Sequence, residues 1–217
     1  MSWTYPEVCL RSETSVMNDV AELVQLIAHE REGRDRGWWD QMARCYHVDS
    51  LVRSMWFTGS GQGFADASRE MAARGDHSRH RLSVPSVHVN RDRAVVSMPM
   101  AIEFRVHIGG VEADLTSYAR GVYRLEMRRG QYRICDLSTI YERDTLIPAV
   151  PGDAIPIDRR RLDMFPASYR MLAYYFNIRG YPIDTDMPSD DRPDLADALL
   201  GQAFTWLDNT QDEEMDR

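Results

Sequence analysis

Two residues of this sequence could carry out acid–base chemistry without a metal or a cofactor: Asp35, in the segment D-R-G-W-W-D, and His80, in the segment H-S-R-H. A carboxylate that binds imidazole Nδ1 fixes the tautomer, raises the histidine pKa and leaves Nε2 to take a proton from carbon or oxygen. The pair therefore predicts a general base. The structural alternative is a capping or solvated aspartate beside a hydrogen-bonded strand histidine.

His77 is the competing histidine, because strand alternation places His77 and His80 on opposite faces. We favour His80, which lies closer to the extended run that follows. His88 shares the face of His80 but lies near the turn N-R-D-R, so we expect it outside a cavity. A third ligand at a suitable spacing is missing, and we therefore predict neither a metal nor a cofactor.

A second polar group comes from a later extended run, where Thr116, Tyr118 and Arg120 share one face by two-residue alternation. If that face is concave, Tyr118 and Arg120 can donate hydrogen bonds to a developing enolate or oxyanion. The alternative is an exposed polar face. Several aromatic and methionine side chains could line a pocket for a flat hydrophobic ligand or form ordinary core: Trp38, Trp39, Met55, Trp56, Phe57, Phe64 and Met71.

The composition of the chain excludes several classes of protein. The chain has 217 residues, 43% of them hydrophobic, which is enough for one main domain with an extension. A net charge of -8 argues against nucleic-acid binding. No apolar run is long enough to span a membrane, and the first residues lack the regions of a signal peptide, so we expect a cytoplasmic protein. Three cysteines, Cys9, Cys45 and Cys135, indicate neither a disulfide framework nor a zinc site.

Helices are predicted first and strands afterwards. Helical spacing predicts helices at 16–34, 38–46 and 64–74, with a strand at 51–57 and a mobile glycine loop at 58–63 as the rim of a cavity. Four long extended runs follow at 81–89, 94–107, 113–127 and 132–142. This order predicts an α+β fold, a cone-shaped α+β barrel with the N-terminal helices packed on a curved antiparallel sheet.

The remainder of the chain predicts an extension. From Asp144 the sequence is rich in proline, which favours an extended arm, and two helices are expected, one after Pro166 and one at 194–207, before an acidic tail. We divide the chain into a barrel domain at 1–147 and an arm with helices at 148–217, which wraps the same domain or a neighbouring subunit. The large sheet and the arm favour self-association, but they do not give the number of subunits.

The helix-helix-strand opening with Asp35, Trp39, Asp40 and Cys45 in the pattern D-x-x-x-W-D-x-x-x-x-C, followed by His80 and a four-strand meander, resembles the SnoaL-like family of the nuclear transport factor two-like superfamily. The resemblance covers about residues 16 to 147. Scytalone dehydratase and hexachlorocyclohexane dehydrochlorinase are the enzyme templates that it suggests. It implies the cone-shaped fold, an enclosed apolar pocket and a homo-oligomer, either a trimer or a dimer.

In those templates an aspartate ending the first helix pairs with a histidine at the start of a pocket-lining strand, which matches Asp35 and His80. Scytalone dehydratase has a second pocket histidine on the following strand, and the resemblance implies that His107, or a residue one or two positions away, takes its place. The dehydratase has tyrosines where this chain has Arg34 and Ser54, and this departure argues against the same dehydration reaction. The sheet also resembles the beta subunits of aromatic-ring-hydroxylating dioxygenases, which carry no catalytic group.

The sequence therefore predicts a cofactor-independent lyase or isomerase acting on a hydrophobic, aromatic small molecule. His80 removes a proton, Asp35 orients the imidazole, and Tyr118 or Arg120 supports the negative charge. The predicted substrate-binding residues are Trp39, Ser54, Trp56, Phe64 and His107. The second hypothesis is a non-catalytic ligand-binding or assembly module, in which Asp35 and His80 are structural. Substrate identity cannot be read from the sequence.

Overall fold

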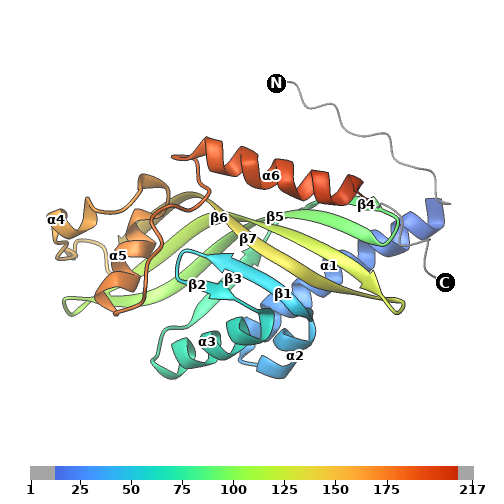
Figure 1. The fold of residues 1–217 in the computed structure, drawn as a ribbon. Coiled ribbons are helices and arrows are strands. Elements are labelled where there is room, and N and C mark those ends of the chain that lie inside the picture. Colours follow the sequence, from blue (N-terminus) through green and yellow to red (C-terminus); the bar gives the residue numbers. More distant parts are fainter. Residues whose placement is uncertain (1–12, 210–217) are drawn as a thin grey trace.

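The computed structural model describes residues 13–209, and side chains from residue 19 onward; Cys9 and the acidic tail lie outside these residues. Two helices precede a seven-stranded curved sheet, a third lies between its strands β2 and β3, and further helices follow it (Figure 1). The helices are α1 (Glu13–Arg36), α2 (Trp39–Arg44), α3 (Gly61–Ala73), α4 (Arg159–Leu162), the 3-10 turn η1 (Ala167–Tyr169), α5 (Arg170–Ile178) and α6 (Pro193–Asp208). The strands are β1 (Tyr46–Ser54), β2 (Phe57–Gly59), β3 (Ser78–Leu82), β4 (Ser86–Asn90), β5 (Arg93–Ile108), β6 (Val111–Arg128) and β7 (Gln131–Pro148).

The strands form one sheet in the order β2-β1-β7-β6-β5-β3, with β4 also paired to β5. The meander from β3 to β7 is antiparallel, whereas β1 runs parallel to β7. The sheet is curved but not closed, since its path ends at β2 and β3. The predicted α+β fold is confirmed, with the correction that the sheet is mixed and not purely antiparallel, since β1 pairs with β7 in parallel.

Two local predictions differ from the structure. The run predicted as one strand at 81–89 is two strands, β3 and β4, with Pro85 in the break between them. The residues predicted as a mobile glycine loop contain β2 and the start of α3, whose Ser60 side chain caps the helix by accepting from the Gly63 amide. Gly61 is needed there, because a Cβ atom would lie 2.1 Å from the Tyr46 ring. The segment 58–63 is therefore a packed helix start.

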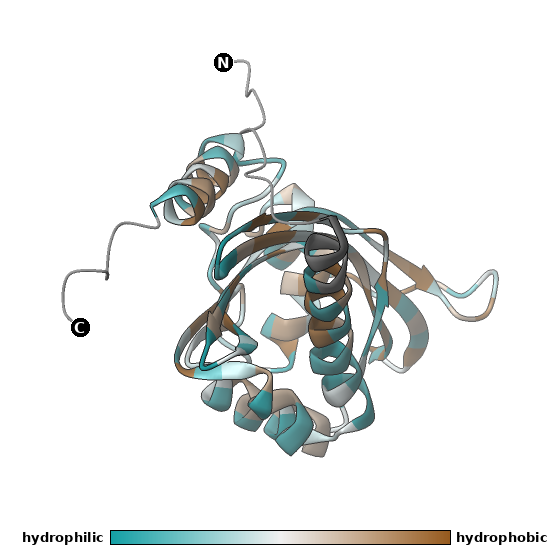
Figure 2. Cartoon of the chain, turned by 90° about the vertical axis from the view of Figure 1, so that its right-hand side faces the viewer, coloured by the Kyte–Doolittle hydropathy of each residue, from teal (hydrophilic) through white to brown (hydrophobic). Residues whose placement is uncertain are grey.

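The helices divide the sheet into a covered inner face and a partly covered outer face. Figure 2 shows α1 along the hollow of the curved sheet, and α6 on the opposite, outer side. Leu23 and Ile27 of α1 are fully buried against the sheet. On the outer side α6 packs on Val95, Val122 and Ile140. The inner face is thus closed by the N-terminal helices at one end of the sheet.

The other end of the inner face is closed by the C-terminal extension. Leu172 and Phe176 of α5 join the same buried cluster as Phe104 and Leu115 of the sheet. The strand β7 continues to Pro148, beyond the start predicted for the arm at Asp144. Residues after 148 therefore pack against the sheet of their own chain.

In the described part of the chain, helices are too short or too polar to cross a membrane.

Candidate functional site

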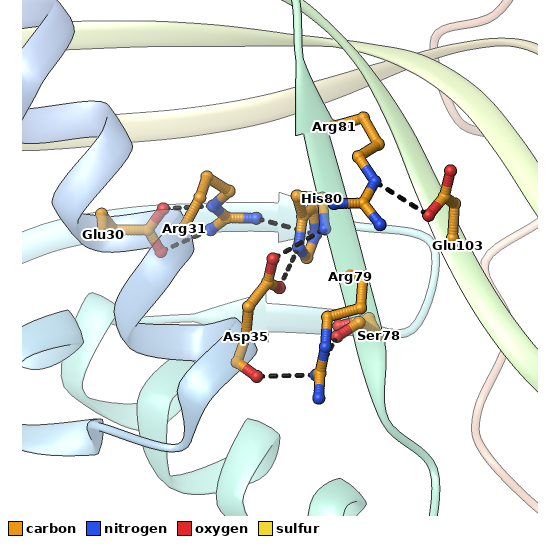
Figure 3. A network of polar contacts seen from close by, with 8 residues as sticks. All are labelled: Glu30, Arg31, Asp35, Ser78, Arg79, His80, Arg81 and Glu103. Atoms are coloured by element: carbon orange, nitrogen blue, oxygen red, sulfur yellow. Dashed lines mark hydrogen bonds and ion pairs between the residues drawn. The ribbon is translucent and has the colours of Figure 1, made fainter.

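Asp35 and His80 meet as predicted (Figure 3). The imidazole Nδ1 lies 2.6 Å from Asp35 Oδ1, and the His80 backbone amide donates to Oδ2 of the same carboxylate over 2.7 Å. The His80 side chain is fully buried, and that of Asp35 is 14% exposed. Because both carboxylate oxygens accept from His80, Nδ1 carries the imidazole proton and Nε2 presents its lone pair.

The ends of two elements create this contact. Gly37, with a φ of +75°, ends α1 just after Asp35, a conformation that favours glycine. In β3 the side chains alternate, so that Ser78 and His80 are buried while Arg79 is exposed. His77 is exposed, just before the strand. The partner of Asp35 is therefore His80 and not His77.

A buried chain of polar contacts continues from His80 into α1. Arg31 Nη1 lies 3.5 Å from His80 Nε2, at the outer limit of a hydrogen bond. Arg31 also donates two hydrogen bonds to Glu30, and the Tyr46 hydroxyl donates to the same carboxylate over 2.8 Å. Among residues 13–209, no cluster of His, Cys, Asp or Glu side chains is placed to hold a metal ion.

The environment of His80 keeps its imidazole neutral. Burial lowers the pKa of His80 to about 4; the Asp35 hydrogen bond opposes this shift, and the charges of Arg31 and Arg34 add to it. The expected rise in this pKa is therefore wrong, because desolvation and two cations outweigh one carboxylate. Burial on its own would raise the pKa of the Asp35 carboxyl, but the hydrogen bonds from His80 lower it.

A small cavity lies between the two buried clusters of the inner face, with a volume of about 30 Å³. This is room for about one or two water molecules. Its wall is largely aromatic and aliphatic, with two guanidinium groups and several hydroxyls: Arg31, Arg34, Val52, Ser54, Trp56, Phe64, Met100, Ile102, Phe104, Tyr123, Leu137, Thr139, Tyr141, Leu172 and Phe176. Arg31 and Arg34, rather than His80, form the cavity wall beside the polar chain.

Arg34 is buried among aromatic rings. Its guanidinium carbon lies 4.8 Å from the ring centroid of Phe64 and 5.4 Å from that of Trp56, within range of cation–π attraction. Burial lowers the pKa of Arg34 to about 10, and the charge of Arg31 adds to the effect. The guanidinium is therefore charged at neutral pH inside an apolar wall.

Three of the predicted substrate-binding residues line this cavity: Ser54, Trp56 and Phe64. Trp39 does not; it lines an outer groove of about 250 Å³, together with Arg34, Asp35 and His77. The groove and the cavity share Arg34. This guanidinium therefore lies between the outer groove and the interior of the sheet.

Three other predicted residues point away from the cavity. Tyr118 and Arg120 alternate with Ser117, Ala119 and Gly121, whose positions are buried on the inner face. Arg120 contacts Ser97 and Glu142, and Tyr118 stacks under Arg143. The expectation that Tyr118 and Arg120 occupy a concave face is therefore wrong, because the register of β6 turns their face outward.

His107 is also on the outer face. It is exposed, and it alternates with Phe104, Val106 and Ile108, which are buried. The pocket position that the resemblance implied for His107 is therefore wrong. On β5 the even-numbered residues Met100, Ile102 and Phe104 line the cavity instead.

The sequence prediction missed Glu30, Arg31, Tyr123 and Tyr141. One signal was available for the first two, because Glu30 and Arg31 follow Ile27 at three and four residues, on the apolar face of α1. Charged residues on the buried face of a helix indicate a polar site. No such signal marked Tyr123 and Tyr141, whose position depends on strand register.

Comparison with known proteins identifies relatives of this chain. Residues 15–138 match the model of the SnoaL-like domain family. A PEP2-like protein of Fusarium vanettenii is 30% identical over 193 residues, which cover 83% of this chain and 82% of that protein. Pea pathogenicity protein 2 of the same fungus is 28% identical with the same coverage.

Solved structures share the fold at low identity. A putative scytalone dehydratase from Novosphingobium aromaticivorans is 15% identical, with a TM-score of 0.52, covering 67% of this chain and 97% of that one. A hexachlorocyclohexane dehydrochlorinase from Novosphingobium barchaimii is 16% identical, with a TM-score of 0.56, covering 67% and 100%. These likenesses show the nuclear transport factor two-like fold. Since the family match spans more than half of the sequence, the chain belongs to the SnoaL-like domain family.

Proposed function

We propose that this protein is a cofactor-independent lyase or isomerase in which His80 moves a proton of a hydrophobic, aromatic small molecule. The observation that carries the proposal is the buried Asp35–His80 pair, with 2.6 Å between Oδ1 and Nδ1. Two of the structural neighbours are named as a dehydratase and a dehydrochlorinase, which supports elimination chemistry.

In the proposed step, the neutral His80 Nε2 takes a proton from substrate carbon. The electrons of the broken C–H bond form a carbon–carbon double bond, and a leaving group departs with its electron pair from the adjacent carbon. In an isomerisation, the imidazolium instead returns the proton to another carbon. Asp35 stabilises the imidazolium and holds its orientation. Since Arg31 lies beside Nε2, its side chain must shift when the substrate binds.

The test is hydrogen–deuterium exchange, which needs no known product. A panel of aryl ketones and arylpyruvates with acidic C–H bonds is incubated in D₂O with the protein, and deuterium incorporation is followed by NMR. We expect His80→Ala to lower the exchange rate by about 10²- to 10⁴-fold, the usual contribution of a general base. Asp35→Asn should lower it less, and His77→Ala is the matched control. Equal exchange by the wild type and His80→Ala would contradict the proposal.

The contact between Arg31 and Nε2 favours a second candidate function, a non-catalytic ligand-binding protein. In that case the polar chain only holds Arg31 in the cavity wall. The exchange assay separates the two functions, since a binding protein gives no deuterium incorporation in any variant.

A further inference from the structure

The cavity wall is rich in hydrogen-bond donors and poor in acceptors. Arg31 and Arg34 both line it. The carboxylates nearest to them are already engaged, because Glu30 accepts from Arg31 and Tyr46, and Asp35 accepts twice from His80. The free hydrogen-bonding capacity at the cavity therefore lies on the donor side.

Arg34 is the strongest of these donors. In the part of the chain that the structure describes, its guanidinium makes no hydrogen bond and no ion pair, and it contacts the rings of Trp56 and Phe64. Burying an arginine without an anion is unfavourable, since the lost hydration is not replaced. A buried cation of this kind is complementary to an anion that the protein itself does not supply.

Two tyrosines add hydroxyl groups on the same cavity. The Tyr123 hydroxyl is buried and has no hydrogen-bond partner among the residues that the structure describes. The Tyr141 hydroxyl accepts from the Met55 amide over 3.1 Å and also forms a hydrogen bond with the Thr139 side chain. Buried unpaired hydroxyls are rare in native proteins and call for a partner. Both tyrosines line the cavity with Arg34.

We propose that the cavity binds the carboxylate of an aromatic substrate, with Arg34 as the residue that pairs with the charge and Tyr123 as an additional donor. This substrate class rests on the proposed function and narrows it to aryl carboxylates. The planar guanidinium suits a carboxylate because it can donate two parallel hydrogen bonds. The rings of Trp56, Phe64, Phe104 and Phe176 supply the apolar contact for the aryl group.

Arg34 also explains how a ligand reaches so small a cavity. The outer groove of about 250 Å³ is lined by Arg34, so an incoming carboxylate meets this guanidinium before it passes inside. The cavity of about 30 Å³ must widen to hold an aryl ring. Leu172 and Phe176 of α5 are the wall residues contributed by the C-terminal extension, and we expect their side chains to move.

The test compares benzoate with benzamide, which has the same shape without the charge. Binding is measured by isothermal titration calorimetry on the full chain and on four variants: Arg34→Gln, Arg34→Lys, Arg36→Gln and His80→Ala. Arg36 is the matched control, because it lies two residues away on α1 and lines the outer groove but not the cavity. Near-UV circular dichroism checks that each variant is folded.

We expect the wild type to bind benzoate at least about tenfold more tightly than benzamide, the effect of one charge-assisted pair. Arg34→Gln should remove this preference, Arg34→Lys should keep part of it, and Arg36→Gln should keep all of it. Equal binding of the two ligands, or an unchanged preference in folded Arg34→Gln, would overturn the proposal. Loss of the preference in Arg36→Gln would place the ligand in the outer groove and also overturn it.

His80→Ala separates this inference from the proposed function. If the variant binds benzoate like the wild type but catalyses no deuterium exchange, both proposals stand. If His80→Ala keeps its exchange activity while the benzoate preference depends on Arg34, the base assignment fails and the ligand class stands.

Discussion

Asp35 and Asp76 are two carboxylates with opposite surroundings. Asp35 lies in the last turn of α1, and Asp76 lies two residues before β3. Asp76 accepts from the hydroxyls of Tyr175 and Tyr181 over 2.5 Å and 2.6 Å, and from Arg179 Nε over 3.1 Å. Its three donors all come from the C-terminal extension. Within residues 13–209, the Asp35 carboxylate accepts only from His80, which itself faces a cation.

The two carboxylates differ in whether the charges around them are balanced by partners within the protein. At Asp76 one negative charge meets one cation and two hydroxyls, so nothing remains for a ligand. Near Asp35 two guanidinium groups face a neutral histidine and a cavity, and one of them, that of Arg34, makes no ion pair within residues 13–209. A balanced buried charge holds two parts of a fold together, whereas an unbalanced one indicates a binding or reaction site.

The largest expected effect on stability is that of Asp76→Ala. Removal of this carboxylate leaves three donors without an acceptor, and we expect a loss of about 3 kcal/mol in the free energy of unfolding. Asp35→Ala should cost less, about 1–2 kcal/mol, because it frees only two donors of a neutral residue. Urea unfolding measures both. Asp66→Ala, a control on α3 whose side chain is 50% exposed, should change stability by less than about 0.5 kcal/mol. A smaller loss in Asp76→Ala than in Asp35→Ala would reverse the comparison.

The next effect is on the pH dependence of stability. The pKa of His80 is about 4 in the folded protein, whereas the ordinary value for histidine, taken here for the unfolded chain, is 6.5. Between these values the unfolded chain binds a proton that the folded chain does not, so stability is complete above pH 6.5 and falls as the pH is lowered towards 4. We expect the free energy of unfolding of His80→Gln to fall by about 2 kcal/mol less than that of the wild type over this pH interval. Urea unfolding at pH 7.5 and 4.5 measures it, with His77→Gln as the exposed control that keeps the wild-type slope.

The smallest effect compares two tyrosines on opposite faces of β6. Tyr118→Phe removes a hydroxyl on the outer face and should leave benzoate affinity unchanged. Tyr123→Phe removes a hydroxyl of the cavity wall, and we expect benzoate to bind about threefold to tenfold more weakly, the value of one neutral hydrogen bond. Calorimetric titration gives both affinities. An effect of Tyr118→Phe equal to that of Tyr123→Phe would remove the distinction between the faces.

Much of the fold could be predicted because local patterns specify it. Helical spacing placed α1 and α3, and the turns between extended runs placed β5, β6 and β7 within a few residues. The Asp35–His80 contact could be predicted from the family resemblance. The outward position of Tyr118 and His107 could not, since one residue of register exchanges the two faces of a strand.

The sequence by itself determined the order of helices and strands, the apolar face of α1, and the residue types available for acid–base chemistry. These follow from short-range periodicity and side-chain chemistry. Only the tertiary structure decided which side chains share the cavity. The parallel pairing of β1 with β7 and the packing of α5 bring Ser54, Tyr141 and Phe176 to Arg34 from distant parts of the chain. The low pKa of His80 was likewise a tertiary outcome, because burial and the charges around a group set its protonation.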